Sequence, residues 1–220
     1  VCFIKKFYPN QIDEQKLLSK NGKLFTSVKR IKALNEAISE GYKMAIFDDG
    51  LQDSSIKYDL TIVCFNNLNW IGNGLTIPSG PLREGVNNLK LYKNVFLNGN
   101  EEYLFDIKDQ IKKINPKINI YQGKYIPLNI REFNKEHNYI VFSGIGNHKT
   151  FINMLKNNNL KIIDDLEYPD HYKYTKNDLD QIIAKAKKKD AKILTTEKDY
   201  LRLDKSDKTE ILFMKSTLEI

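Results

Sequence analysis

The sequence predicts an α/β protein built on parallel sheets, and three observations favour this class. Short apolar runs rich in β-branched and aromatic residues alternate with amphipathic helical patterns along most of the chain. Hydrophobic residues make up 41% and charged residues 29% of the sequence, which is typical of a globular protein. At 220 residues, the chain is long enough for one large domain or two modest ones, each with its own core.

The first part of the chain predicts one clear helix and three strands. Apolar residues recur at helical spacing from 27 to 40. These residues are Val28, Ile31, Leu34, Ala37 and Ile38. Continuous apolar runs predict strands at 44–47, 60–65 and 94–98, and a loop rich in Gly and Pro lies at 71–84.

The second part predicts a compact alternation of strands and helices after a linker. The stretch 111–136 lacks helical periodicity, contains Pro116 and Pro127, and alternates at 117–121, which favours an exposed linker ribbon. We therefore place the boundary between two α/β domains near 130–137 and expect domains at 1–130 and 131–220. The elements expected after the linker are strand 139–142, turn 143–146, helix 149–157, strand 161–164, helix 178–188, strand 192–195 and strand 210–214.

The net charge indicates which kinds of partner the chain could bind, and the cysteine content indicates whether its thiols are reduced. The net charge of +7 and the pI of about 9.1 favour an anionic partner: a nucleic acid, a phosphorylated metabolite or an anionic membrane surface. No apolar run approaches the roughly 18 residues of a membrane span. Two cysteines are too few for a disulfide framework, and Cys64 lies in an apolar run, which predicts a reduced, buried thiol.

Asp48 and Asp49 directly follow the apolar run 44–47, which is a Walker B pattern. In that pattern a buried strand delivers a carboxylate to the carboxyl edge of the sheet, where it can hold Mg²⁺ beside nucleotide phosphates. The alternative is an aspartate that only caps a turn. The doubled Asp followed by Gly50 and Gln52 favours the functional interpretation.

Two further segments contain candidate site residues, although each also has a structural explanation. Glycines and prolines at 72–82 predict a rigid, sharply turning loop, and Arg83 and Glu84 stand at its exit, where an arginine can meet a phosphate or stack on a base. The alternative is a surface loop with a salt-bridged arginine. Asp170 and His171 could form an acid/base pair or bind a metal, but an Asp-His pair is more often structural.

The order of the motifs along the chain is more informative than any one of them. It resembles the order in the tetraacyldisaccharide 4'-kinase family, over about residues 12–203. The segment from Asp13 to Leu18 resembles the family's GDEP segment, although Ile12 and Gln15 stand where the family has Gly and Pro. The other matching motifs are DDGLQ at 48–52, GNG at 72–74, PSGPLRE at 78–84, FSGIGN at 142–147, PDH at 169–171 and TTEKD at 195–199.

The resemblance implies a fold and an activity. The fold is a P-loop NTPase-like parallel sheet with helices on both faces, joined by a two-stranded linker to a smaller α/β domain. The activity is ATP- and Mg²⁺-dependent phosphorylation of the 4' hydroxyl of an acylated glucosamine disaccharide 1-phosphate, which gives lipid IVA in lipid A biosynthesis. The expected location is the cytoplasmic face of the inner membrane of a Gram-negative bacterium, on its anionic surface.

The same resemblance implies roles for residues that match the family's motifs. Asp48 and Asp49 would serve Mg²⁺ and the phosphates, with Asp48 as the metal ligand. Asp13 would pair with His171 to activate the sugar hydroxyl. The residues expected to shape the nucleotide and transfer site are Gln52, Arg83, Glu84 and Asp170.

The G-x-x-x-x-G-K-[ST] phosphate loop does not occur in the 220 residues. The family's loop precedes the Asp13 segment, so we expect the chain to be a fragment that binds ATP poorly and is inert by itself. One alternative is another P-loop kinase or ligase of a small metabolite. A basic module that binds nucleic acid ranks last, because the basic residues are dispersed and no nucleic-acid motif is present, so we expect no nucleic-acid partner.

Overall fold

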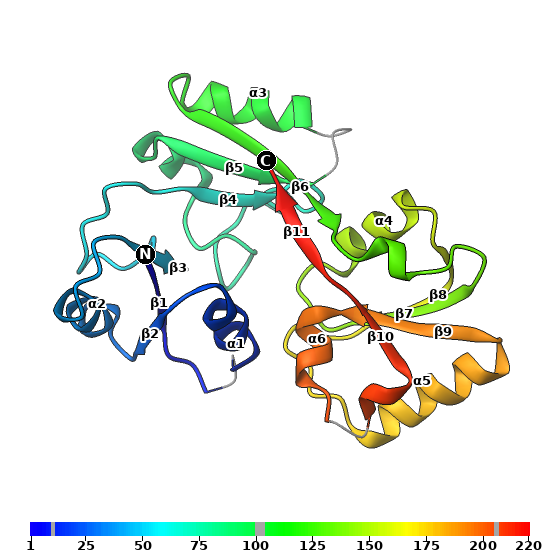
Figure 1. Ribbon diagram of the computed structural model, residues 1–220. Coiled ribbons are helices and arrows are strands. Elements are labelled where there is room, and N and C mark those ends of the chain that lie inside the picture. Colours follow the sequence, from blue (N-terminus) through cyan, green and yellow to red (C-terminus); the bar gives the residue numbers. More distant parts are fainter. Residues whose placement is uncertain (10–11, 100–103, 205–206) are drawn as a thin grey trace. The chain divides into compact units, whose positions relative to one another are not determined.

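The computed structural model describes residues 1–9, 12–99, 104–204 and 207–220 (Figure 1). The side chains of Asp13 and Asp207 also lie outside the described part. The chain forms two compact units, which are described separately. The larger unit comprises Val1–Lys57 and Leu128–Lys215, and the smaller comprises Tyr58–Pro127 and Ser216–Ile220. The assignment of domains to 1–130 and 131–220 remains a prediction.

Parallel strands and their crossover helices build the larger unit. Its sheets have the strand orders β2-β1-β3 and β10-β9-β7-β8. In chain order its elements are β1 (Cys2–Lys6), α1 (Ile12–Asn21), β2 (Leu24–Ser27), α2 (Arg30–Ser39), β3 (Ala45–Asp48), η3 (Ile130–Glu132), β7 (Asn138–Ser143), α4 (His148–Asn157), β8 (Lys161–Glu167), α5 (Lys176–Lys188), β9 (Ala191–Thr196), α6 (Glu197–Arg202), η4 (Asp207–Thr209) and β10 (Ile211–Met214).

In the sheet β2-β1-β3, the chain moves from β1 to β2 in one direction and then to β3 in the other. Right-handed crossovers therefore place α1 and α2 on opposite faces, as Figure 1 shows. The predicted helix 27–40 was too long, because Ser27 pairs with Lys6 as the last residue of β2. Its apolar face was also partly wrong: Val28 and Ile38 are exposed, while Ala33 and Ala37 of α2 are buried.

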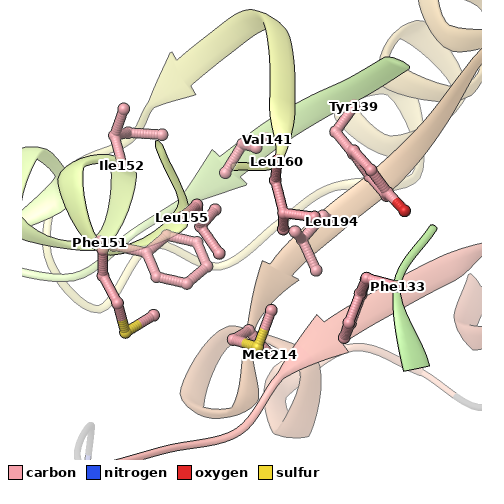
Figure 2. Close-up of a cluster of buried hydrophobic side chains, with 10 residues drawn as sticks. Phe133, Tyr139, Val141, Phe151, Ile152, Leu155, Leu160, Leu194 and Met214 are labelled. Atoms are coloured by element: carbon pink, nitrogen blue, oxygen red, sulfur yellow. The ribbon is translucent and has the colours of Figure 1, made fainter. Parts of the chain in front are cut away.

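The sheet β10-β9-β7-β8 is covered on both faces, as the side chains of its strand β7 show. Successive residues of a strand point to opposite faces. Tyr139 and Val141 belong to the buried cluster that includes residues of α4, drawn in Figure 2, while Ile140 and Phe142 belong to the cluster that includes residues of α5. A strand buried on both faces is a continuous apolar run, which is what the sequence shows at 139–142.

The smaller unit has one sheet among its described residues, with the order β11-β6-β5-β4. β4, β5 and β6 are parallel, whereas β11 pairs with β6 antiparallel. Val95, Leu97, Ile107 and Ile111 lie in its buried core. Its elements are β4 (Val63–Asn66), η1 (Val86–Leu91), β5 (Asn94–Asn98), α3 (Leu104–Ile114), β6 (Asn119–Pro127) and β11 (Ser216–Glu219).

The expected two-stranded linker corresponds to β6 and β11. β6 ends and β11 begins where the chain passes between the units, and the Leu128 amide donates to the Lys215 carbonyl at 2.8 Å beside these two points. Two expectations nearby were wrong. Helix α3 extends to Ile114, and Cys64 is exposed on the edge strand β4 rather than buried. No helix in the described segments combines the length and apolar character that a membrane span requires.

Candidate functional site

The candidate site begins at the carboxyl ends of β1 and β3, where the strand order reverses and where α/β proteins usually bind ligands. Lys5 of β1 stands in register beside Asp48 of β3. Lys5 is only 3% exposed, and its Nζ contacts the Asp48 carboxylate and donates to Glu14 Oε2 at 2.7 Å. A buried ammonium needs such partners, because an unpaired charge would be costly to desolvate.

The turn after β3 is held by a buried arginine. Arg30 of α2 donates from Nη2 to the backbone carbonyl of Asp49 at 2.7 Å, and its Nη1 lies 3.7 Å from the Asp53 carboxylate. Asp49 has a φ of 60°, in the left-handed region that residues with a Cβ seldom adopt. Strained backbone of this kind clusters at functional sites, where the surrounding structure holds it in place.

Glu14 of α1 connects the two sheets of the larger unit. Its carboxylate accepts from Lys5 at 2.7 Å and from Lys198 of α6 at 3.0 Å, and it lies 3.4 Å from His171 Nε2. Burial alone would raise the pKa of Glu14, but the hydrogen bonds from Lys5 and Lys198 outweigh it and hold the pKa below its usual value. Glu14 is therefore ionised and joins three side chains.

His171 lies in the loop between β8 and α5, in a strained conformation. Its φ is 59°, and its backbone amide donates to the Gly144 carbonyl at 3.1 Å and to Asp170 Oδ1 at 3.0 Å. Its Nδ1 is 3.3 Å from Arg202 Nη2, and its Nε2 is 3.8 Å from Asp170 Oδ2. The ring therefore lies between a guanidinium on one side and carboxylates on the other.

Asp199 anchors this part of the site. It is fully buried and accepts hydrogen bonds from the Gly144 amide at 3.1 Å, Tyr174 Oη at 3.0 Å, Thr196 Oγ1 at 2.6 Å and Arg202 Nη1 at 2.9 Å. Burial and the neighbouring Asp199 charge raise the pKa of the Tyr174 hydroxyl, which remains a donor. The buried carboxylate is thus well paired, and it fixes the position of Arg202 beside His171.

The structure brings some of the predicted site residues together and leaves others apart. Asp48, Asp170 and His171 are linked in the larger unit, and Asp49 and Gln52 follow Asp48 in the same unit. The Asp13 side chain lies outside the described residues. Arg83 and Glu84 belong to the smaller unit, where Glu84 accepts from Tyr92 Oη at 3.2 Å. The roles of all eight residues remain predictions.

The sequence motifs did not predict the role of four charged residues of this cluster: Lys5, Glu14, Lys198 and Arg202. A lysine directly after the apolar residues of a strand was one available signal, because a charge at a buried strand position needs a partner. Glu14 lies in the segment from Asp13 to Leu18 and Lys198 lies in the TTEKD motif, but neither motif predicted a role for them. Arg202 had no such signal.

The donor chemistry fits a nucleotide-associated Mg²⁺ better than a metal held by protein alone. Among the described residues, no group of three or more His, Cys, Asp or Glu could hold a metal ion. Mg²⁺ at nucleotide sites usually needs only one or two carboxylates, with phosphate and water as its other ligands. The Asp48 carboxylate stands at a strand end and its side chain is 42% exposed, so it suits that requirement.

Comparisons with known proteins agree on one family. A family model described as Tetraacyldisaccharide-1-P 4'-kinase matches residues 10–220. The tetraacyldisaccharide 4'-kinase of Pelagibacter ubique (strain HTCC1062) is 75% identical over 219 residues, which are 100% of this chain and 70% of that protein. The tetraacyldisaccharide 4'-kinase of Rickettsia bellii (strain OSU 85-389) is 37% identical over 201 residues, covering 89% of this chain and 60% of that protein.

A solved structure supports the fold. LpxK from Aquifex aeolicus, crystallised in complex with ATP, has a TM-score of 0.60 and 20% identity to this chain, and the match covers 99% of this chain and 74% of the other. Together with the parallel sheets and their helices, this likeness confirms the predicted α/β fold class. By length, this chain spans 70% of the Pelagibacter relative and 60% of the Rickettsia bellii relative.

Proposed function

Since the chain belongs to the tetraacyldisaccharide-1-P 4'-kinase family, as its motif order indicated, we propose that it forms part of a lipid kinase. The reaction would transfer the γ-phosphoryl group of ATP to the 4' hydroxyl of an acylated glucosamine disaccharide 1-phosphate and yield lipid IVA. The observation that carries the proposal is one connected cluster of charges. Asp48 is linked through Lys5 and Glu14 to His171, all within the larger unit.

Phosphoryl transfer depends on alignment and charge neutralisation more than on covalent chemistry by the protein. Mg²⁺, when bound with the nucleotide, would neutralise charge on its phosphates. Asp48 would hold that ion. Asp49, in the turn that follows β3, would also serve the ion and the phosphates. Lys5 keeps the Asp48 carboxylate at the strand end, which limits the rearrangement needed when the nucleotide arrives.

The acceptor hydroxyl would be oriented by the other end of the cluster. His171 and its proposed partner Asp13 would activate the hydroxyl, and Glu14 beside His171 would help to align its oxygen with the phosphorus. Lys198, whose side chain is 19% exposed, lies 3.0 Å from Glu14 and 3.8 Å from Asp170, and would stabilise negative charge there. Gln52, Asp170, Arg83 and Glu84 would complete the nucleotide and transfer site.

The test uses a hybrid in which this chain replaces the matching 70% of the Pelagibacter relative. We expect the hybrid to transfer phosphate from ATP to the acylated disaccharide in the presence of Mg²⁺. Asp48→Asn should lower kcat/KM by about 100-fold or more, because a carboxylate that organises charge at the transferred phosphate is lost. Asp180→Asn, a matched change at an exposed residue of α5, should have no effect.

A folded hybrid that transfers no phosphate, while the unmodified Pelagibacter enzyme does, would overturn the proposal. Full activity of the Asp48→Asn hybrid would remove Asp48 from the mechanism. The acceptor separates the proposal from the alternative of a small-metabolite kinase. If a disaccharide without acyl chains were phosphorylated as efficiently as the acylated one, the lipid substrate would lose its support.

A further inference from the structure

The geometry around His171 defines where the proton of its neutral ring resides. Arg202 Nη2 lies 3.3 Å from His171 Nδ1. A guanidinium has five N–H donors, no acceptor, and stays charged in proteins. A hydrogen bond between these two nitrogens therefore requires Nδ1 to accept through its lone pair, so Nδ1 carries no proton in this arrangement.

The opposite side of the ring supports the same conclusion. His171 Nε2 lies 3.4 Å from Glu14 Oε1 and 3.8 Å from Asp170 Oδ2. Ionised carboxylates only accept hydrogen bonds, so a proton on Nε2 is favourable there and a lone pair is not. Lys5 and Lys198 keep Glu14 ionised, since their hydrogen bonds lower its pKa.

Arg202 and His171 both donate hydrogen bonds to one backbone group, the Gly144 carbonyl. Arg202 Nη1 donates to the Gly144 carbonyl at 2.7 Å and to buried Asp199 at 2.9 Å. The His171 amide donates to the same Gly144 carbonyl at 3.1 Å. The Arg202 side chain is only 10% exposed. The distance between guanidinium and ring is therefore set by the surrounding structure.

We propose that Arg202 is a positioning residue that holds the neutral His171 ring with its proton on Nε2, on the side of the ring where Glu14 and Asp170 lie. The consequence deepens the proposed function and rests on it. His171 would present an N–H to the transfer site and act there as a hydrogen-bond donor. Removal of the acceptor's proton would then fall to a carboxylate of the cluster and not to Nε2 of His171.

The experiment is nitrogen-15 NMR of the imidazole rings in this chain, without nucleotide or lipid. The chain has three histidines, His137, His148 and His171, and the signals lost in His171→Gln identify those of His171. We expect a protonated Nε2 and an unprotonated, hydrogen-bonded Nδ1. A proton on Nδ1 in the neutral ring would overturn the proposal, whatever the kinase activity of the hybrid.

Arg202→Lys tests whether the arginine is the cause. This variant keeps a positive charge for Asp199 but loses the two-armed geometry that reaches His171 and Gly144 together. We expect the Nδ1 signal of His171 to shift by several ppm toward the position of a nitrogen without that hydrogen bond. The signals of buried His148, bonded to Ser143 Oγ at 2.6 Å, should stay unchanged and report an intact sheet.

The matched control is Arg131→Lys, at an exposed arginine of η3 in the same unit, which should leave His171 unchanged. Unchanged His171 signals in folded Arg202→Lys would show that Arg202 has only a structural role. If Arg202→Lys fails to fold, the spectrum of the unsubstituted chain still decides the tautomer.

Discussion

At the scale of single residues, Glu14 has more influence on the site than its position in a surface helix suggests. It is the shared partner of Lys5, Lys198 and His171. Lys5 and Glu14 come from neighbouring elements, but Lys198 is 184 positions away along the chain. A carboxylate with several cationic partners is stabilised in its charged form, which makes the stability of the chain depend on pH.

We predict that Glu14→Gln lowers the free energy of unfolding at neutral pH by about 2 kcal/mol, because two hydrogen bonds to charged groups are weakened. The folded pKa of Glu14 is depressed, so its contribution is fully present above its unfolded value of about 4.3 and is lost as the pH falls through the folded pKa. The difference between wild type and variant should therefore shrink in acid. Denaturant unfolding from neutral pH down to about pH 3 measures it.

The matched control for this prediction is Glu36→Gln, at an exposed position of α2. It should change stability little at any pH. A difference between Glu14→Gln and wild type that stayed constant into acid would argue against an ionised Glu14 at the centre of the cluster.

At the scale of elements, α5 shows how local chemistry places a helix next to the site. Thr175 Oγ1 accepts from the Asp178 amide at 3.2 Å, and the Asp178 carboxylate accepts from the Thr175 amide at 2.8 Å. This capping box satisfies two of the N–H groups that every helix start leaves unpaired. It fixes the N-cap of α5, Thr175, four residues after His171, so the length of the intervening loop is set.

Thr175→Ala should lower the free energy of unfolding by about 1 kcal/mol, the usual cost of a lost N-cap. Urea denaturation followed by circular dichroism would measure it. Asn177→Ala, at an exposed residue in the first turn of the same helix, should cost much less. Equal losses in the two variants would mean that the Thr175 cap adds nothing to stability.

At the scale of the whole molecule, the excess of basic over acidic side chains is compatible with an anionic membrane surface. Lys and Arg number 35 against 28 Asp and Glu, and several of the acidic residues are already paired with lysines inside the larger unit. Each Lys or Arg near an anionic bilayer contributes about 1 kcal/mol, and salt screens the attraction. A kinase with a lipid acceptor would benefit from such an attraction.

We predict that the chain sediments with vesicles containing phosphatidylglycerol at low salt and is released as salt is added. Vesicles of phosphatidylcholine alone, the matched control, should retain little of it. Equal binding to both kinds of vesicle would rule out an electrostatic role for the net charge. Tighter binding to duplex DNA than to anionic vesicles, with a steep salt dependence, would favour the nucleic-acid alternative.

Much of this protein could be predicted from the sequence by itself, because the signals lie in contiguous residues. Alternation of apolar runs and helical periods determined the α/β class, and the run at 139–142 predicted a strand, which the structure buries on both faces. The order of the motifs determined the family. Asp48, Asp170 and His171 were chosen for their chemistry, and the structure connects them through one cluster.

Only the tertiary structure decided which charges meet. The sequence does not indicate the partners of Lys5 and Arg202, yet Lys5 contacts Asp48 and Arg202 contacts His171. Helix α2 also begins later than the predicted start at Ser27, because Ser27 pairs with Lys6 of β1 as part of strand β2. Contacts of this kind arise because parallel strands that are far apart in the sequence bring their carboxyl ends to one edge of a sheet. The hydrophobic periodicity of a single segment does not specify which side chains then come within hydrogen-bonding distance.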